Sequence, residues 1–383
     1  MPRRNRPTRA HRSRRSGLFG RQFGTRLTSY APQLGPIVAI PGVMVVIALA
    51  VAGPHISETA SQALFTGDWS QSHTWAGMLL KTGLTALSFL AVAVAAAVGH
   101  SVAGRSAVIP AALGGLAATG VQAGVLAGLA AGAFAGVTTL ALQRVPVPPR
   151  LHGLSSTVLF PLVTTVATSF LVIGVVGEFL NSLSEWLHGE LAGLEFSNAV
   201  AAGAVLGAMA CADLGGMVTR TAIGFGSVEL GGDPSRFSTL NMTLMAAVIA
   251  AGMVPGLALP LATLVRRGLF TEGERGYART GWLLGAAFLP EGAIPFALAD
   301  PLRVLPASML GGAVTGALVM DLGATSKTPY GGVFALGETG RPLLFLLAVV
   351  AGVLTTTALT VGLKSLPFAA PARATATRLA TSG

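Results

Sequence analysis

The stretch from residue 289 to residue 306 decides the fold; it reads Leu-Pro-Glu-Gly-Ala-Ile-Pro-Phe-Ala-Leu-Ala-Asp-Pro-Leu-Arg-Val-Leu-Pro. It places one carboxylate, Glu291, between two prolines in apolar sequence, and Asp300 and Arg303 at its edge are expected to form a structural pair. Each proline removes a backbone donor and clashes with the preceding helical turn, so one straight helix is excluded. Broken backbone inside a membrane is tolerated only where protein or a water-filled cavity satisfies it. An acid held there predicts a functional site; the alternative is a loop with a solvated glutamate.

The composition indicates a protein that crosses a membrane many times. Of 383 residues, 52% are hydrophobic and only 10% are charged, and the mean hydropathy is +0.69. Soluble domains carry roughly 25% charged residues, so this chain has too few charges to cover a soluble globule. Apolar runs long enough to cross a bilayer as a helix can be cut from it about nine or ten times. Because these runs do not alternate as the strands of a β-barrel must, we predict an all-α polytopic membrane protein.

The basic charge is concentrated at the ends of the chain and in short loops. The net charge is +10, and residues 1–30 hold nine arginines and no acid. The positive-inside rule predicts that the N-terminal arm at 1–30 is cytoplasmic, near anionic lipid headgroups, and that the tail at 366–383 is cytoplasmic too. We expect a membrane-embedded domain at 31–365 between them, and a disordered tail. The expected location is the plasma or inner membrane. The same rule accounts for the charge without a nucleic-acid partner.

The apolar segment at 239–265 presents a topological conflict. Arginines precede it, and residues 266–280 after it hold four more. The positive-inside rule would place both flanks in the cytoplasm, which a single crossing does not allow. Either the chain turns back at the two prolines inside the segment, or the region before it is not cytoplasmic. The sequence leaves both alternatives open.

Other segments predict packing and surface features. Glycines at every fourth residue from Gly120 to Gly136 predict a face on which helices pack closely in lipid. Residues 154–179 predict a membrane span, and residues 181–196 predict a separate amphipathic helix on the outer surface. The single cysteine, Cys211, excludes a disulfide framework and is interpreted as a packing residue. No metal site and no cofactor are expected.

Four segments together resemble the membrane subunit, enzyme IIC, of fructose-type sugar phosphotransferase systems, over roughly residues 25–365. They are Pro-Glu-Gly-Ala-Ile-Pro-Phe at 290–296, Ala-Asp-Pro-Leu-Arg-Val-Leu-Pro at 299–306, Ile-Ala-Ala-Gly-Met-Val-Pro at 249–255 and Phe-Thr-Glu-Gly-Glu-Arg at 270–275. The resemblance implies a homodimeric, all-helical permease with re-entrant hairpins. Such permeases bind a hexose at mid-membrane and present it on the cytoplasmic side to the phosphorylated IIB and IIA subunits.

The resemblance also implies roles for this chain and for its partners. The glutamate of the family motif, Glu291 here, is the expected ligand of the sugar hydroxyl that receives phosphate. Neither IIB nor IIA sequence, nor a phosphocysteine loop, occurs in these 383 residues, so we expect separate chains to complete the transfer. Whether this chain is itself an enzyme stays open, because the phosphoryl donor would lie on those chains.

The chemistry of a sugar explains why carboxylates and glycines belong in such a site. A buried polar group left unpaired costs about 1–3 kcal/mol, so a dry site must pair each hydroxyl. A carboxylate accepts several charge-strengthened hydrogen bonds, so Glu291, with Gly292 beside it, would fix the acceptor hydroxyl and draw its proton as a general base. Asp213 is a second candidate, beside Gly215 and Gly216, whose backbone can approach a ligand. Its alternative role is to cap the following helix.

Several positions depart from the family pattern. Tyr330 stands where the family has histidine, and Met217 and Arg220 stand where it has proline and lysine. Tyrosine keeps hydrogen bonding but stays neutral at pH 7, so it cannot supply positive charge to a transferring phosphoryl group. Lys327 is expected to supply that charge, and Lys327→Ala would then abolish phosphotransfer while sparing sugar binding. Two functions stay open: a phosphotransferase-system permease for a fructose-like hexose, or a diverged facilitator or sensor without phosphotransfer.

Overall fold

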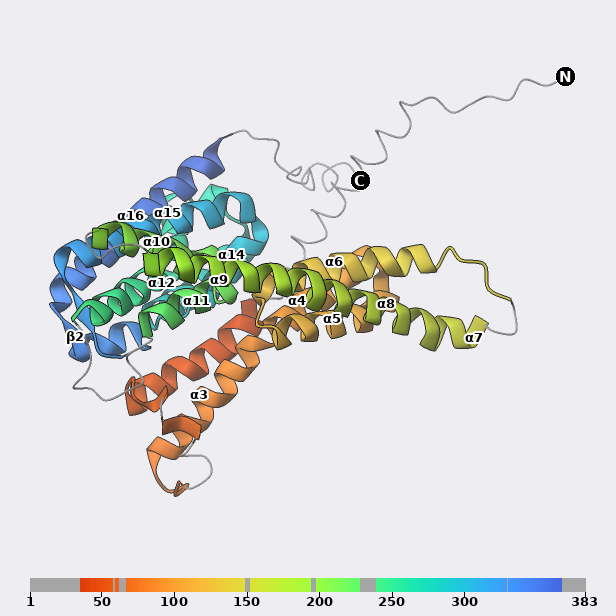
Figure 1. The fold of residues 1–383 in the computed structure, drawn as a ribbon, viewed down its shortest axis with the longest axis horizontal. Helices are drawn as coiled ribbons and strands as arrows, with labels where there is room; N and C mark the ends of the chain where they lie inside the picture. Colours follow the sequence, from red (N-terminus) through yellow and green to blue (C-terminus); the bar gives the residue numbers. More distant parts are fainter. Residues whose placement is uncertain are drawn as a thin grey trace, which may run out of the picture.

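The computed structural model is almost wholly helical across the residues it describes (Figure 1). These are residues 35–57, 59–61, 67–148, 152–193, 198–227, 239–328 and 330–366. The arm predicted at 1–30 lies outside them, as does the predicted tail beyond residue 366. Within the described part of the chain, the strands form one short antiparallel pair, β1 (Thr325–Ser326) with β2 (Thr339–Gly340).

Seven helical stretches among the described residues are long and apolar enough to cross a membrane. The predicted all-helical, multi-pass membrane class is therefore confirmed. About nine or ten crossings were expected from run length, and one of the seven stretches alone holds three helices in succession. The stretches are Gly35–Ala52, Ser72–Gly120, Gly124–Leu142, Ser155–Leu187, Thr239–Val265, Pro301–Leu322 and Pro342–Ser365.

A first group of helices packs through small residues. We call it the N-terminal group: α4 (Leu90–Ala103), α5 (Val108–Gly120), α6 (Gly124–Leu142) and α8 (Phe160–Phe170), which contact one another on the right of Figure 1. The predicted glycine face is present in α6, where a Cβ on Gly128 would lie 2.5 Å from the carbonyl oxygen of Ala91 in α4. Gly120 differs, because nothing lies within 4 Å of its would-be Cβ.

A second group surrounds one buried helix. This C-terminal group comprises α10 (Ala199–Ala212), α12 (Thr239–Val265), α13 (Glu272–Ala286), α15 (Pro301–Leu322) and α16 (Pro342–Ser365). The helix α12 runs through its middle, and most of its residues are buried. In α10 the thiol of Cys211 is fully buried and donates to the carbonyl of Ala251 at 3.2 Å, which is a packing role.

The helix α12 excludes one of the two alternatives in the topological conflict. It is continuous, with Pro255 and Pro260 both inside it. The alternative in which the chain turns back at these prolines is therefore wrong. At about 1.5 Å of rise per residue, a helix of this length crosses the hydrocarbon core once. The other alternative, in which the region before the segment is not cytoplasmic, stays a prediction.

A buried ion pair connects α13 to the last helix. Lys364, in the final turn of α16, lies 3.3 Å from Glu274, and the two side chains are only 6% and 4% exposed. The other carboxylate oxygen of Glu274 accepts from the backbone N–H of Thr271 at 2.6 Å, as part of a capping box that begins α13. The ammonium also lies 4.2 Å from the centre of the Phe270 ring.

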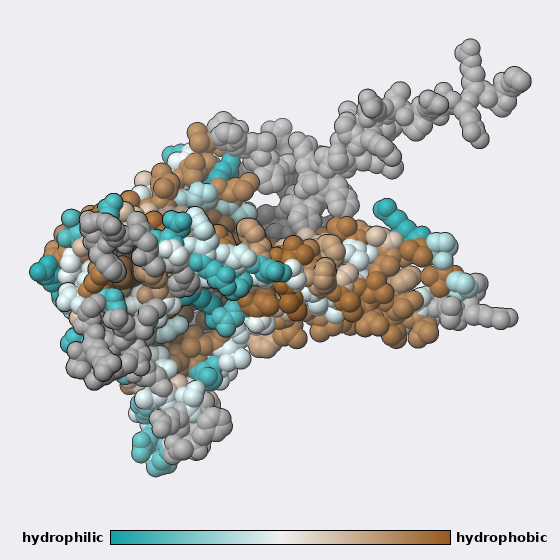
Figure 2. All heavy atoms as spheres, in the orientation of Figure 1, coloured by the Kyte–Doolittle hydropathy of each residue, from teal (hydrophilic) through white to brown (hydrophobic). Residues whose placement is uncertain are grey.

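The segment before α10 differs from its prediction. Residues 155–187 form one helical stretch, in which π-helical turns at Ser155–Leu159 and Leu171–Gly177 flank α8, and α9 (Glu178–Gly193) continues it. The expected break between a span and a separate outer helix near residue 180 is therefore wrong. Apolar side chains such as Phe170 and Phe179 are exposed along it. Figure 2 shows apolar side chains covering the right-hand part of the molecule, where α8 lies in Figure 1. This surface suits contact with lipid.

The proline-rich stretch at residues 289–306 is broken into helical pieces, as expected. A 3₁₀ turn, η8 (Pro290–Ala293), is followed by the short helix α14 (Ile294–Ala299) and then by α15. Each piece has a proline at its first or second position, where a missing N–H costs nothing. The break places Glu291 at a turn between the two groups of helices.

Candidate functional site

A cavity of about 350 Å³ lies where the two groups of helices meet. Its size falls in the range of roughly 300–1,000 Å³ that is usual for small-molecule sites. Its walls come from α3 (Ser72–Ser88), the start of α4, the α5–α6 turn, the α10–α11 turn with α11 (Met217–Ser227), and the turn before η8. The polar residues that line it are Lys81, Thr85, Ser88, Thr119, Gln122, Thr219, Arg220, Glu291 and Tyr330.

Glu291 lines this cavity, and one of its two carboxylate oxygens is unpaired within the part of the chain that the structure describes. Its Oε2 is buried and has no hydrogen-bond partner among the described residues, and Glu291 lines the cavity. Burying a charged oxygen without a partner is costly, so such an atom fits a site in which a ligand or water donates to it. A sugar hydroxyl is a donor of this kind.

Gly215 makes the room that Glu291 needs. Its backbone has φ +98°, and a Cβ at this position would overlap Oε1 of Glu291. The neighbouring Gly216 packs against the α5–α6 turn, where a Cβ on Gly124 would lie 2.6 Å from its Cα. Two helix turns from opposite groups therefore touch through backbone alone, directly beside the carboxylate.

Asp213 is occupied by the helix that follows it. Its Oδ2 accepts from the backbone N–H of Val218 at 2.7 Å, and its Oδ1 accepts from the N–H and hydroxyl of Thr219 at 3.0 and 2.6 Å. It is not among the residues that line the 350 Å³ cavity. This geometry is that of a cap on α11, the alternative that the sequence left open, and it fixes the turn that carries Gly215.

Backbone strain is concentrated around the cavity. Four non-glycine residues among those described have positive φ, and three of them line the cavity: Gln122 (53°), Leu214 (51°) and Phe288 (61°). Each lies in a turn where a helix ends. Such conformations cost about 1–3 kcal/mol each and cluster at functional sites, so they support the assignment of this cavity as the site.

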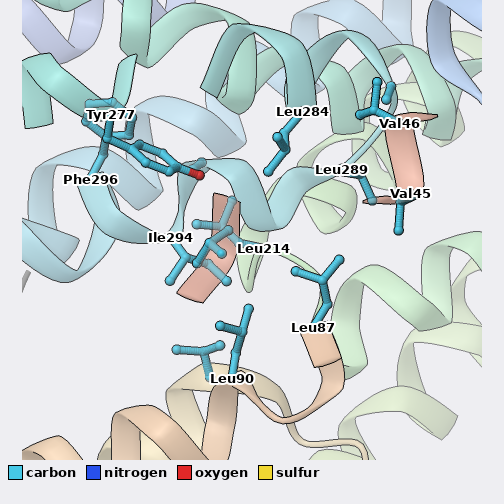
Figure 3. Close-up of a cluster of buried hydrophobic side chains, with 14 of the residues drawn as sticks. Val45, Val46, Leu87, Leu90, Leu214, Tyr277, Leu284, Leu289, Ile294 and Phe296 are labelled. Carbon is cyan, nitrogen blue, oxygen red and sulfur yellow. The ribbon is translucent and has the colours of Figure 1, made fainter. Parts of the chain in front are cut away.

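Apolar side chains complete the wall. Leu87, Leu90, Leu214 and Leu289 line the cavity and belong to one buried cluster, which Figure 3 shows. They offer apolar surface to the C–H faces of a ligand, while the polar groups fix its orientation.

Of the remaining predicted site residues, one lines the cavity and two do not. Tyr330 lines the cavity, with its ring centre 6.1 Å from that of Phe288. Gly292 is buried against Leu284 and does not line the cavity. Lys327 is exposed and is likewise not among the lining residues.

The second acid of the proline-rich stretch is engaged elsewhere. Nη1 of Arg303 lies 3.1 Å from Oδ2 of Asp300, outside the cavity lining, and Nη2 donates to the carbonyl of Leu366 at 3.4 Å. The pair joins the start of α15 to the end of α16.

Sequence reasoning named Arg220 only as a departure from a motif, although its side chain lines the cavity. Nε donates to the carbonyl of Gly215 at 3.4 Å, and Nη1 donates to Oε1 of Gln122 at 3.5 Å. The available signal was its place in the first turn of the helix after the Gly-Gly pair. Gln122 and Thr119, in the α5–α6 turn, carried no such signal.

Membrane-spanning helices in two groups with a polar cavity between them are the architecture of a membrane permease. No family profile matches the chain. The chain is 37% identical over 277 residues to the fructose permease IIC component of Bacillus amyloliquefaciens, covering 71% of this chain and 87% of that protein. It is 33% identical over 296 residues to the fructose-like permease IIC component 2 of Escherichia coli K12, covering 75% and 78%.

A third relative is longer. The chain is 35% identical over 343 residues to the fructose-specific EIIABC component of the phosphotransferase system of Bacillus subtilis, and spans about half of that protein's length (51%). The chain belongs to the family of fructose-type permease IIC components of phosphotransferase systems, as its motifs predicted.

Proposed function

We propose that this chain is the sugar permease subunit, IIC, of a fructose-type phosphotransferase system. It binds a fructose-like hexose in the cavity between the two helix groups and presents it for phosphorylation during import. The observation that carries the proposal is Glu291 itself, which lines a cavity of about 350 Å³ and whose buried Oε2 has no partner among the described residues. Relatives named fructose permease IIC components support the choice of sugar.

In this mechanism Glu291 accepts a hydrogen bond from the sugar hydroxyl that will receive phosphate. As the phosphoryl group arrives, the carboxylate draws the hydroxyl proton, which is general-base work. Tyr330 and Gln122 line the same cavity and can pair other hydroxyls. Gly215 and Asp213 act as positioning residues, because they shape the turn that faces Glu291.

The partners follow from the same proposal. Phosphorylated IIB and IIA subunits would supply the phosphoryl group, and relatives named EIIB'BC and EIIABC components support this. We further propose a homodimer in the cell membrane, surrounded by lipid, with both termini in the cytoplasm.

Uptake of labelled fructose into vesicles tests the proposal. The vesicles carry the protein and are assayed with and without phosphoenolpyruvate and the soluble components of the system. We expect fructose phosphate to accumulate inside only with both additions, and Glu291→Gln to abolish this. If fructose phosphate forms equally well with Glu291→Gln, the assignment of the base is wrong.

A second candidate is a facilitator or sensor that binds sugar without phosphotransfer. Tyr330 favours it, because a neutral side chain stands in the cavity where the family pattern has histidine. In the same vesicles, a facilitator would bring free fructose to equal concentrations inside and outside, with or without phosphoenolpyruvate.

A further inference from the structure

The cavity carries more positive than negative charge. Among the described residues that line it, the cations are Lys81 and Arg220 and the only acid is Glu291. A hexose is neutral and needs no such excess. An anion does, because a cavity with apolar walls strengthens the field of any charge that lines it. The charge balance therefore suits an oxyanion in addition to a sugar.

Arg220 is the cation best placed for that anion. It lies against the same glycine as Glu291: its Nε donates to the carbonyl of Gly215, and a Cβ on that glycine would overlap the glutamate carboxylate. Lys81 is already hydrogen bonded to the hydroxyl of Ser61, at 3.2 Å. Lys327, the cation that the sequence favoured, is exposed and does not line the cavity.

The guanidinium of Arg220 keeps donors for a ligand. It offers five N–H groups, and its two hydrogen bonds, at 3.4 and 3.5 Å, are longer than the usual range of about 2.7–3.2 Å. No carboxylate among the described residues lies within ion-pair distance of it. Its partner Gln122 has a strained backbone conformation, with φ 53°, in the turn whose side chain accepts the hydrogen bond from Arg220.

We propose that Arg220 binds the phosphoryl group as it passes to the sugar, an inference that rests on the proposed function. The planar guanidinium matches two phosphoryl oxygens at once, which a point charge does not. In the transfer, the sugar oxygen forms a bond to phosphorus, and the bond from phosphorus to the donor atom of the partner subunit breaks with its electron pair on the donor. The hydroxyl proton passes to Glu291. Arg220 stabilises the charge on the equatorial oxygens.

Three variants test this: Arg220→Met, Arg220→Lys, and Arg105→Met, the control, which removes an exposed arginine from outside the cavity. Each is measured for fructose affinity without donor, for phosphotransfer with the soluble components, and for affinity toward fructose 1-phosphate and fructose 6-phosphate. We expect Arg220→Met to slow phosphotransfer by about 100- to 1,000-fold, as the loss of one oxyanion donor does. It should also weaken binding of a fructose phosphate while leaving fructose affinity within about twofold, because only the phosphate carries the charge that it pairs. Arg220→Lys should show a phosphotransfer rate and a fructose phosphate affinity between those of Arg220→Met and the wild type. Arg105→Met should match the wild type in all three measurements.

Three outcomes overturn the inference. Arg220→Met could lose fructose affinity as much as phosphotransfer, which makes the arginine a sugar ligand or a structural residue. Arg220→Met could retain full phosphotransfer, which would mean that the arginine does not act on the phosphoryl group. Lys327→Ala could abolish phosphotransfer while Arg220→Met does not, which would assign the charge to Lys327.

Failure of the proposed function gives a different result. The wild type would then transfer no phosphate to fructose. If it still bound a fructose phosphate through Arg220, the oxyanion site would stand without the transfer.

Discussion

Replacing Gly215 by alanine tests the geometry on which the whole site depends. The new methyl group would overlap the carboxylate of Glu291, and the backbone at φ +98° disfavours any residue with a Cβ. The conformational cost is about 1–2 kcal/mol and should lower the stability of the protein. Displacing Glu291 removes a charge-assisted hydrogen bond to the sugar, about 1.5–3 kcal/mol. At 1.4 kcal/mol per tenfold, this weakens fructose binding by about 10- to 150-fold.

Binding of labelled fructose to the purified protein in lipid nanodiscs measures this loss, and a thermal melt of the same sample measures stability. The matched control is Gly224→Ala, on α11, where nothing lies within 4 Å of the added methyl group. Alanine inside a helix is favoured over glycine by about 0.5–1 kcal/mol, so this control should melt slightly higher and bind normally. Adding Glu291→Asp to Gly215→Ala shortens the acid and should recover part of the lost stability. Unchanged fructose affinity in Gly215→Ala would refute the placement of Glu291.

Further substitutions test packing, strain and charge. Lys364→Met leaves the buried carboxylate of Glu274 without its partner and should cost about 3–5 kcal/mol of unfolding free energy; the double variant Lys364→Met/Glu274→Gln should cost less, and equal melts would contradict this. Gln122→Gly relieves a positive φ, so it should raise the free energy of unfolding by about 1 kcal/mol and with it the melting temperature. It should also slow phosphotransfer, because Arg220 loses its hydrogen bond to the glutamine side chain. Faster phosphotransfer would contradict the role of Gln122 in holding Arg220. Tyr330→His adds an acid–base group to the cavity and should speed phosphotransfer by about tenfold or more; no gain would mean that the charge at this position is not limiting.

The sequence predicted the class of fold well because membranes impose strong rules. Too little charge for a soluble surface, together with long apolar runs, leaves helices as the solution. The breaks around Glu291 were also predictable, since a proline stands at the first or second position of η8, α14 and α15. The same logic did not predict that α12 continues through its prolines. Buried against α13, α15 and α16, its freed carbonyls lie among other helices rather than lipid.

The site was only partly predictable because it is assembled from turns far apart in the chain. Glu291 and Tyr330 were found through motifs, and both line the cavity. Lys327 lies close to Tyr330 in sequence, but the direction of an irregular segment cannot be read from its residues. Arg220 and Gln122 meet because two helix groups bring their turns together, and no local pattern reports such a meeting.

The burial of Cys211 has a practical consequence for experiments on transport. Because the only thiol in the chain is sealed between α10 and α12, maleimide reagents should leave the native protein unlabelled. A cysteine introduced at Ser88 or Thr119, which line the cavity, would then be the single reactive handle. Labelling it with a membrane-impermeant reagent from each side of sealed vesicles would report through which face of the bilayer solvent enters, and protection by added sugar would report occupancy.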